Sequence, residues 1–457
     1  MNCLSLPRLV SLGFKISILV ALLAFLARVA AAQQPVTADT TIRLTLGEAV
    51  RLAARQNAAV ESARYRVQAA QARVTQRRAD LLPDVTGVAA ERRTTLNSAA
   101  AFPIELPVPG IDPRGSILGP LDVFDARARV TQSLFDPAAR GRIQSARTSV
   151  AAAGADVGQT ADVAATSAAS AYLSVLRADA VYRARLQDST LATELLQIAR
   201  DQLSAGTGVA LDVTRARAQL TSARSQLIAA RNERDRTRID LARSLSLPLV
   251  NLVLVDSLST LPLNVATTER EALDVAYRGR NDLQAITLQA EAARQQASAI
   301  RKEALPKVGL QADYGLRQRN GRSYLPTYDL GLMLSLPIFD GFRREGRVEE
   351  QTQIARELDN RARDLRTQVE ADVRIAVLNL ASSTEAVAAA RERLSLAEQE
   401  VAQSRERFQA GVAGNADVIT ASLTLNSART QLVDALTAYQ ASRVALARAE
   451  GVISTLD

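Results

Sequence analysis

The chain has 457 residues, with no His, no Trp, a single Cys and a formal net charge of +8. The absence of His excludes a His-dependent catalytic triad and His metal ligands, and no G-x-x-x-x-G-K-[ST] phosphate loop is present. We therefore expect no enzymatic activity, no cofactor and no metal. Aromatic residues make up only 4% of the chain, and the abundance of Ala, Leu, Arg, Gln and Glu predicts long helices packed through small side chains.

A secretory signal peptide is predicted over residues 1–32. Two cations precede the apolar run "ISILVALLAFLA" at 16–27, and small residues follow it. The run is shorter than the roughly 20 apolar residues that a membrane anchor needs, which favours cleavage. Cys3 precedes the run, so the mature chain would have no thiol. Residues 33–44 are expected to form a linker. An exported chain without a basic, aromatic cluster is not expected to bind nucleic acid.

The rest of the chain reads as two similar halves, 45–247 and 271–450, with a linker at 248–270 and a tail at 451–457. Four landmarks recur in the same order in both halves. They are "EAVRLAARQN" (48–57) and "EALDVAYRGR" (271–280), "RADLLPDV" (78–85) and "RKEALPKV" (301–308), "QSLFDPAARGR" (132–142) and "LPIFDGFRREGR" (336–347), and "ARDQLSAGTGVALDVTRARAQLTSAR" (199–224) and "SRERFQAGVAGNADVITASLTLNSAR" (404–429). Each half is predicted to contain a helix, two strands and a long helical hairpin.

Each half begins with a helix that leads to two strands. Thr45 and Glu48 form a capping-box pattern, and the helix that they open is predicted to run from Leu46 to Leu81. Pro83 and its counterpart Pro306 end the first helix of each half. Apolar and polar residues then alternate in four segments. The predicted strands are 84–93, 124–135, 308–317 and 328–336.

The alternation along these strands is compatible with two environments. A soluble sheet with one wet face would show it, and so would strands of about 9–12 residues that cross a membrane at a tilt. Four strands cannot close a barrel, and open edges are not tolerated in lipid. Strands that span a membrane would therefore require several copies of the chain to share one barrel. The connection at 94–123, with five prolines, is expected to be a long exposed loop, and that at 318–327 a short one.

The longest predicted helices follow the strand pairs. No Pro occurs between Pro137 and Pro248, so 138–204 can form one helix of about 100 Å. Its polar residues indicate that it crosses an aqueous compartment. Gly206 and Gly411 follow the long helices, where a positive φ can close a helix C-terminus. The repeated stretch is thus predicted to be the tip of a helical hairpin.

Asp212 and Asp417 stand where the return helices of the two hairpins begin. A carboxylate at such a position can cap free N–H groups and meet the positive end of the helix dipole. Capping alone would account for both aspartates.

The chain resembles the TolC-like outer-membrane efflux proteins. The resemblance is carried by the order of its features, which are the signal peptide, the duplicated halves with their strand pairs, the four long helical arms and the "R-F-x-x-G-x-x-x-x-x-D-V" tip at 407–418. The resemblance implies a mainly α fold with a membrane β-barrel portion. Three chains would form a 12-stranded barrel, and their long helical hairpins an α-barrel. It implies a homotrimer in the lipid of the cell outer membrane, with a long periplasmic extension. Its partners would be a periplasmic adaptor (membrane fusion) protein and an inner-membrane transporter.

The resemblance also implies function. The chain would be the passive channel-tunnel of a tripartite efflux or type I secretion system. Asp417 matches an acidic residue that forms a ring at the channel constriction, Phe408 an aromatic tip position, and Asp212 its first-half partner. Three Asp417 carboxylates would repel one another and favour cations. Adaptor docking is implied at the hairpin tips, at Gly206, Thr207, Gly208, Gly411, Val412 and Ala413.

This chain departs from the family pattern in two positions. Ala413 and Thr420 stand where the pattern has an Arg and a second Asp, so the cross-link that latches such tips is expected to be missing or rebuilt.

The alternative to a channel is a periplasmic coiled-coil adaptor or scaffold protein. It would explain the signal and the helices, but it would need neither four alternating strands nor a Pro-rich loop. Drug efflux, protein secretion and metal export all remain compatible with the sequence.

Overall fold

The computed structural model describes residues 42–97, 117–248, 252–259, 261, 268–319, 321–410, 412 and 414–455. The predicted signal peptide, most of the linker 33–44, part of the linker 248–270, most of the Pro-rich loop, and residues Gly411 and Ala413 lie outside these ranges. The chain divides into two units, Met1–Arg43 with Val250–Val253, and Leu44–Leu249 with Leu254–Asp457. In the first unit the described residues belong to two short paired strands, β1 (Ile42–Leu44) and β4 (Leu252–Leu254).

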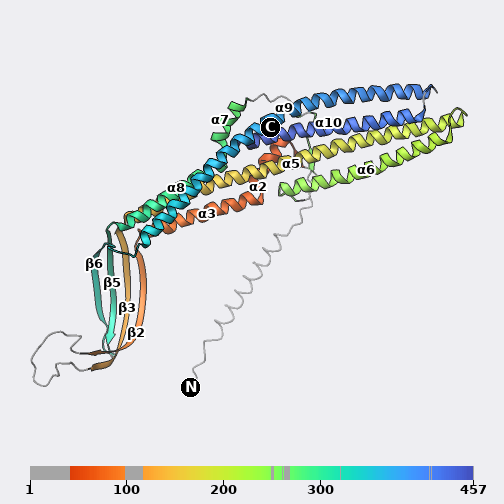
Figure 1. Cartoon of the computed structure of the whole chain (residues 1–457). Coiled ribbons are helices and arrows are strands. Elements are labelled where there is room, and N and C mark those ends of the chain that lie inside the picture. The colour runs from red at the N-terminus through yellow and green to blue at the C-terminus, as the bar shows by residue number, and fades with distance from the viewer. Residues whose placement is uncertain are drawn as a thin grey trace, which may run out of the picture. The chain divides into compact units, whose positions relative to one another are not determined.

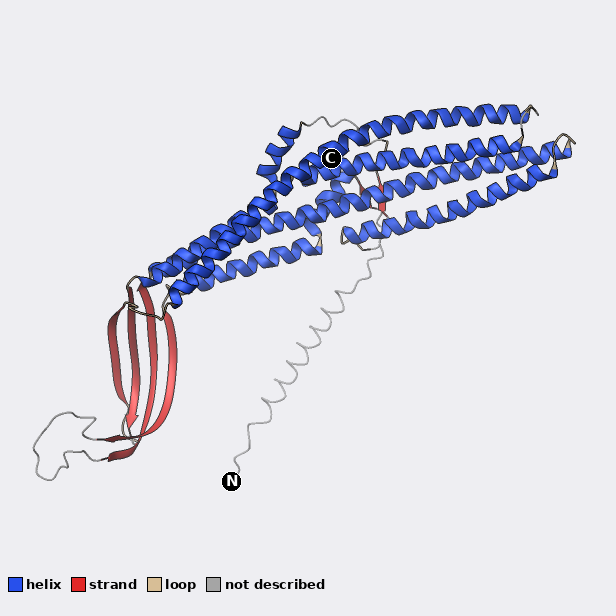
Figure 2. Cartoon of the chain, viewed as in Figure 1, coloured by secondary structure: helices blue, strands red, loops and turns tan. Residues whose placement is uncertain are grey.

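The second unit repeats one order of elements twice, as predicted (Figures 1 and 2). Its first half contains α2 (Leu46–Gln56), α3 (Ala58–Ala79), β2 (Asp84–Asn97), β3 (Ile117–Phe135), α5 (Pro137–Ser204) and α6 (Ala210–Ser244). Its second half contains α7 (Glu269–Gly279), α8 (Asn281–Arg301), the 3₁₀ turn η1 (Lys302–Ala304), β5 (Lys307–Arg319), β6 (Leu325–Ser335), α9 (Arg343–Gln409), α10 (Asn415–Ala449) and η2 (Ile453–Thr455). The mainly helical, twofold-repeated fold class is confirmed, with α5 and α9 spanning 68 and 67 residues.

The first helix of each half is broken, which differs from the predicted continuous helix Leu46–Leu81. The capping box at Thr45 and Glu48 is present, but the helix divides at Asn57, whose backbone is extended. The Asn57 side chain accepts a hydrogen bond from the Ala59 N–H and donates one to the Ser244 carbonyl, 3.1 Å away. This contact with α6 stabilises the break. The second half divides at Arg280 in the same way.

The four long strands form one antiparallel sheet in the order β2-β3-β5-β6, so β2 and β6 are its edges. Strands β2 and β3 extend into the segment 94–123, which was predicted to be wholly loop. Their pairing shifts register between Thr94 and Leu96, opposite Gly119 and Pro120. A bulge of this kind accommodates a proline, which cannot donate a ladder hydrogen bond.

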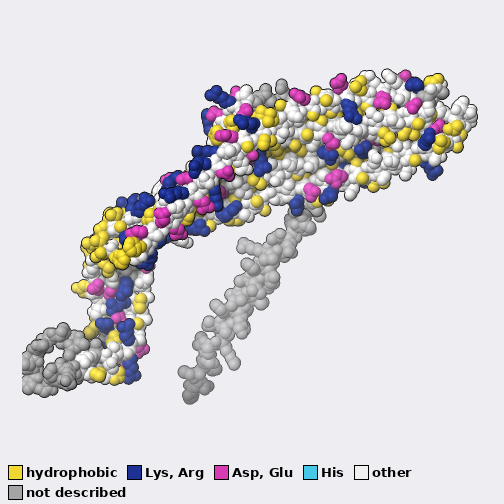
Figure 3. Space-filling model, viewed as in Figure 1, with side chains coloured by type: hydrophobic (Ala, Val, Ile, Leu, Met, Phe, Trp, Pro, Cys, Tyr) yellow, Lys and Arg dark blue, Asp and Glu magenta, His cyan; other side chains and the backbone are white. Residues whose placement is uncertain are grey.

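The register gives the sheet one apolar and one polar face. On β6, Tyr328, Leu330, Leu332 and Leu334 are 70–82% exposed and lie opposite Tyr314, Ala312, Leu310 and Val308 of β5. Beyond β6, the apolar residues Leu336, Ile338, Phe339 and Phe342 are also exposed. Figure 3 shows hydrophobic side chains gathered where the sheet meets the helices.

Charged residues occupy the other face of the sheet. Arg127 of β3 donates to Asp125 at 2.6 and 2.7 Å and to Asp313 of β5 at 2.9 Å. Gly315 lies beside Arg127 in the register, and a Cβ there would overlap the Arg127 side chain and the Ala126 carbonyl oxygen. Glycine at this position therefore leaves room for Arg127 to reach across to β5. Alternation of this kind, apolar on one face and charged on the other, is typical of membrane barrel strands.

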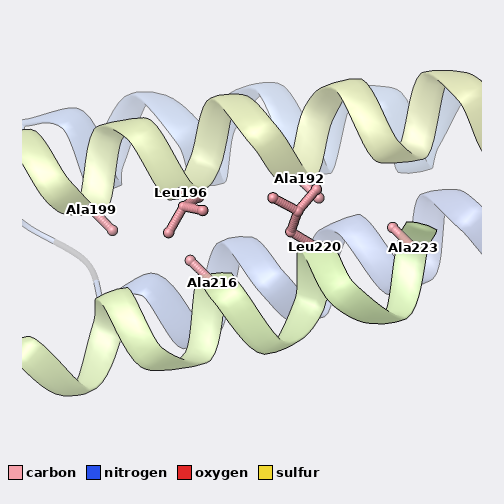
Figure 4. Close-up of a cluster of buried hydrophobic side chains, with 6 residues drawn as sticks. All are labelled: Ala192, Leu196, Ala199, Ala216, Leu220 and Ala223. Atoms are coloured by element: carbon pink, nitrogen blue, oxygen red, sulfur yellow. The ribbon is translucent and has the colours of Figure 1, made fainter. Parts of the chain in front are cut away.

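The helices pack through small residues, as the composition predicted. Helix α5 contacts α3, α6, α8 and α10, and α9 contacts α8 and α10. Between α5 and α6, buried alanines and leucines recur every three or four residues and interlock across the hairpin (Figure 4). They are Ala192, Leu196, Ala199, Ala216, Leu220 and Ala223. Alanine at most of these positions allows the two backbones to approach closely.

Candidate functional site: the helical hairpin tips

The first hairpin tip is a compact turn between α5 and α6. Helix α5 ends at Ser204, and Gly206 adopts the positive φ (73°) that the sequence predicted. The N–H groups of Thr207 and Gly208 both donate to the Gln202 carbonyl at 2.9 Å. A Cβ on Gly208 would lie 2.9 Å from that of Gln202. Gly206 is therefore required by its backbone conformation, and Gly208 by its close approach to the helix end.

The second tip connects α9 to α10. The Val412 N–H donates to the Arg407 carbonyl at 3.0 Å, and Gly414 precedes α10. Val412 is exposed, as are Val209 and Leu211 at the first tip. Both tips thus present apolar side chains to solvent, which suits them to contact another protein.

Asp212 and Asp417 lie in the first turn of α6 and α10, but neither caps its helix. The N-cap residues are Val209 and Gly414, and neither helix has a side-chain cap hydrogen bond. The capping explanation is therefore wrong, although both carboxylates still meet the positive end of a helix dipole. Asp212 is half-buried and lies 3.9 Å from Arg215. Asp417 is exposed and makes no ion pair with any described residue, which leaves its charge free.

Phe408 lies between the two hairpins. Its side chain is only 3% exposed and packs against Leu195 of α5 and Val418 of α10. Its carbonyl accepts a hydrogen bond of 3.0 Å from the Gln202 side chain. In this structure Phe408 therefore joins α9 to α5 within one copy. The position of Phe408 at the channel constriction, which the resemblance implied, stays a prediction.

Asn415 also joins the tips, and sequence reasoning missed it. It is fully buried at the start of α10, and its side-chain nitrogen donates to the Asp212 carbonyl at 3.0 Å. Its side-chain oxygen has no hydrogen-bond partner among the described residues. This asparagine therefore fixes the start of α10 against the first turn of α6.

A buried charge cluster joins the hairpins nearer the middle of the helices, and it was also missed. Asp188 of α5 is buried and forms ion pairs with Arg429 of α10 at 2.9 Å and with Arg185 at 3.1 Å. Arg185 also donates to the Thr430 hydroxyl at 3.2 Å. Burial raises the pKa of Asp188, and the hydrogen bonds and charges of the two arginines offset only part of this rise. The contact between the hairpins has no local sequence signature, because its α5 and α10 members lie about 240 residues apart.

No group of three or more Cys, Asp or Glu side chains in the described ranges is arranged to hold a metal ion. The tips offer exposed apolar residues and, in the first turn of α10, the exposed Asp417 carboxylate, which makes no ion pair with a described residue. This arrangement is suited to contacts with proteins and passing ions.

The duplication and the fold can be compared with known proteins. A model of the outer membrane efflux protein family matches residues 49–246 and 272–452, one segment in each half. No match was found among curated proteins. The matched segments include all four long strands, which a coiled-coil adaptor or scaffold would not require.

Several solved structures share the fold, among them three bacterial outer-membrane proteins. The outer membrane protein VceC from Vibrio cholerae has 19% identity and a TM-score of 0.70, covering 89% of this chain and 96% of that chain. The CmeC outer membrane channel of Campylobacter jejuni has 16% identity and a TM-score of 0.71, with coverages of 89% and 85%. The open-state MtrE outer membrane channel of Neisseria gonorrhoeae has 16% identity and a TM-score of 0.72, with coverages of 89% and 89%. The chain therefore belongs to the outer membrane efflux protein family, and its role is that of a channel-tunnel.

Proposed function

We propose that three copies of this chain form one continuous conduit, with the sheets in the outer membrane and the helical hairpins in the periplasm. The observation that carries the proposal is the four-stranded sheet, which has unpaired edges at β2 and β6 and an exposed apolar face. Open edges cannot remain unpaired in lipid. Pairing of β6 with β2 of the next copy would satisfy them, and three copies give a closed barrel of 12 strands.

The helices support the same assembly. Helix α9 contains a stretch apolar enough to cross a membrane by length and composition, but only 33% of that stretch is buried. Ile375 and Leu378 within α9 are more than half exposed. The many charged residues elsewhere in α9 argue against a lipid-buried helix. Neighbouring copies in an α-barrel would cover these side chains instead.

The tips would form the periplasmic mouth of the conduit. Asp417 is exposed and unpaired in the described part of the chain, so three copies would place a ring of carboxylates at the constriction, with Asp212 beneath it. Phe408 and Asn415 would hold the second hairpin against the first. Adaptor docking would use the turn residues Gly206, Thr207, Gly208, Gly411, Val412 and Ala413, together with the exposed apolar side chains beside them.

In this proposal the chain is passive, and an inner-membrane transporter supplies the energy through a periplasmic adaptor. The test is fractionation followed by reconstitution. The protein should remain in the outer membrane until detergent extracts it, and the extract should form ion-conducting pores in planar lipid bilayers. Recovery of the chain in the soluble periplasmic extract, without pore activity, would refute the proposal.

A further inference from the structure

A cleft of about 380 Å³ lies between α3 and α5, close to where the helices meet the sheet. Three arginines line it, Arg73 and Arg77 from α3 and Arg142 from α5, and no carboxylate does. The rest of its polar lining comes from Gln76 of α3, Ser145 and Ser149 of α5, and Gln296 of the adjacent helix α8. The volume lies within the range of about 300–1,000 Å³ that small-molecule sites occupy.

Arg73 and Arg77 are not neutralised within the chain. Both are exposed, and neither forms an ion pair with a described residue. They stand four residues apart on one helix, where like charges repel one another. Arg142, by contrast, lies 3.1 Å from Asp136, 3.6 Å from Asp80 and 3.6 Å from Glu303. The three neighbouring acids are thus engaged by Arg142, and the guanidinium groups of Arg73 and Arg77 have no acidic partner within the described part of the chain.

The duplicated architecture does not require this pair of cations. The landmark that begins at Arg78 in the first half begins at Arg301 in the second. The residues that correspond to Arg73 and Arg77 are therefore Gln296 and Ile300. A helix at the same place in the repeat thus forms without either charge.

Contacts connect the cleft to the polar face of the sheet. Asp136, which pairs with Arg142, also lies 3.8 Å from the Lys307 amine. Lys307 begins β5 on the same face as Gln311 and Asp313, the face that carries the Arg127 network. A second cavity of about 290 Å³ nearby is lined by Lys307, Arg343, Arg344 and Arg347 against only Glu303 and Asp340. Cations therefore outnumber acids around this junction.

We propose that the cleft between α3 and α5 binds anionic groups of molecules that pass through the conduit, and that its ligands are small organic or inorganic polyanions such as phosphates and sulfonates. The inference rests on the proposed function, in which the polar face of the sheet lines the passage. Guanidinium groups suit this task because they bind phosphate and similar oxyanions through two parallel hydrogen bonds. With one cleft per copy, three such sites would surround the passage.

The test is block of single-pore current in planar bilayers by inorganic tripolyphosphate, at low and matched ionic strength. The double variant Arg73→Gln/Arg77→Gln is compared with Arg66→Gln/Arg78→Gln. The control removes the same charge from exposed positions of α3 that do not line the cleft. We expect the half-blocking concentration to rise at least about tenfold for the cleft variant, and to stay within about twofold for the control.

Three results would overturn the inference while leaving the conduit intact. One is a wild-type pore that conducts but is not blocked. Another is an equal loss of block in both variants, which would indicate the general field of the protein. The third is unchanged block together with a less stable trimer in the cleft variant, which would indicate that the arginines pair with a neighbouring copy. Failure of the wild-type protein to form any pore would instead refute the proposed function.

Discussion

Asp188 of α5 and Arg429 of α10 form a buried ion pair of 2.9 Å that joins the two helical hairpins of one chain. The same carboxylate also binds Arg185. The hairpins are therefore held together well before their tips, and the Phe408 contacts and the Asn415 hydrogen bond continue the attachment to the ends. Loss of one arginine would leave the buried Asp188 carboxylate less well compensated.

Substitution Arg429→Met should destabilise the folded protein by about 3 kcal/mol, because the buried Asp188 carboxylate would keep Arg185 but lose its ion pair with Arg429. The matched control is Arg177→Met, which breaks the exposed pair with Asp434 between the same two helices. That change should lower stability by less than about 1 kcal/mol. Denaturant unfolding followed by helical circular dichroism measures both values. Equal losses in the two variants would contradict the role assigned to the buried pair.

The break between α7 and α8 should give the protein a specific sensitivity to acid. Burial alone would raise the pKa of Asp282, but hydrogen bonds and charge from Arg280, with the Leu283 N–H, hold this pKa below its usual value. A lowered folded-state pKa stabilises the protein above the unfolded value of about 3.9, and this contribution is lost as pH falls through the folded value. Asp282→Asn should therefore lower the melting temperature at pH 7 and make less difference below about pH 4.

The control for this experiment is Asp274→Asn, which removes an exposed pair with Arg278 on α7. It should change the melting temperature little at any pH. If Asp282→Asn lowers the melting temperature by the same amount at pH 3 and pH 7, the ion pair is not the source of the acid sensitivity.

The exposed carboxylate at the second tip should set ion selectivity. Asp417→Ala should reduce the preference of the pore for cations, seen as a shift in reversal potential across a salt gradient, because three carboxylates leave the constriction. Glu398→Ala removes one exposed acid from α9, away from the tip, and should shift the potential much less. An unchanged reversal potential in Asp417→Ala would remove this residue from the constriction.

The two faces of the sheet should respond oppositely to a new charge. Leu332→Arg places a cation on the apolar face and should lower the stability of the inserted barrel by about 2–4 kcal/mol if the site lies at mid-membrane depth. Gln311→Arg adds the same charge to the polar face on the adjacent strand and should insert normally. Urea unfolding of liposome-reconstituted protein compares them. Equal tolerance of both arginines would indicate that the face assigned to lipid is wrong.

Gly206→Val tests the first hairpin tip. A β-branched residue at φ 73° is strained by about 1–2 kcal/mol, so the turn should rearrange while the trimer still forms. Adaptor-dependent export should fall because the docking surface is distorted. Gly414→Val serves as a control, because φ at Gly414 is −81° and nothing lies near its Cβ position. Failure of Gly206→Val to form trimers would assign this glycine a purely structural role.

The sequence predicted the features that depend on local pattern. The alternation of apolar and polar residues predicted the strands, and the absence of Pro predicted the long helices α5 and α9. Gly206 predicted a helix end with a positive φ. The breaks at Asn57 and Arg280 were missed because neither residue interrupts a helical pattern. The Asn57 break depends on a hydrogen bond to the Ser244 carbonyl, distant in the chain.

The contacts between the two hairpins could not be predicted from local sequence patterns either, because they also join residues that are distant in the chain. A charged residue in a long helix is solvated by default, so Asp188 gave no sign of its burial. The resemblance gave Phe408 only a position at a tip, and its packing against Leu195 of α5 and Val418 of α10 depends on residues far from it or across the turn. The Asp212 and Asp417 carboxylates were placed correctly in the first turns, yet the N-cap position falls three residues earlier.

The central claim is that one copy of the sheet is incomplete and that three copies close it. Native mass spectrometry of the detergent-extracted, outer-membrane protein measures this directly. We predict a particle of three mature chains, which loses its assembly when a proline at the centre of edge strand β6, such as Leu330→Pro, blocks strand pairing. A stable single-chain particle that still conducts ions in a bilayer would contradict the account.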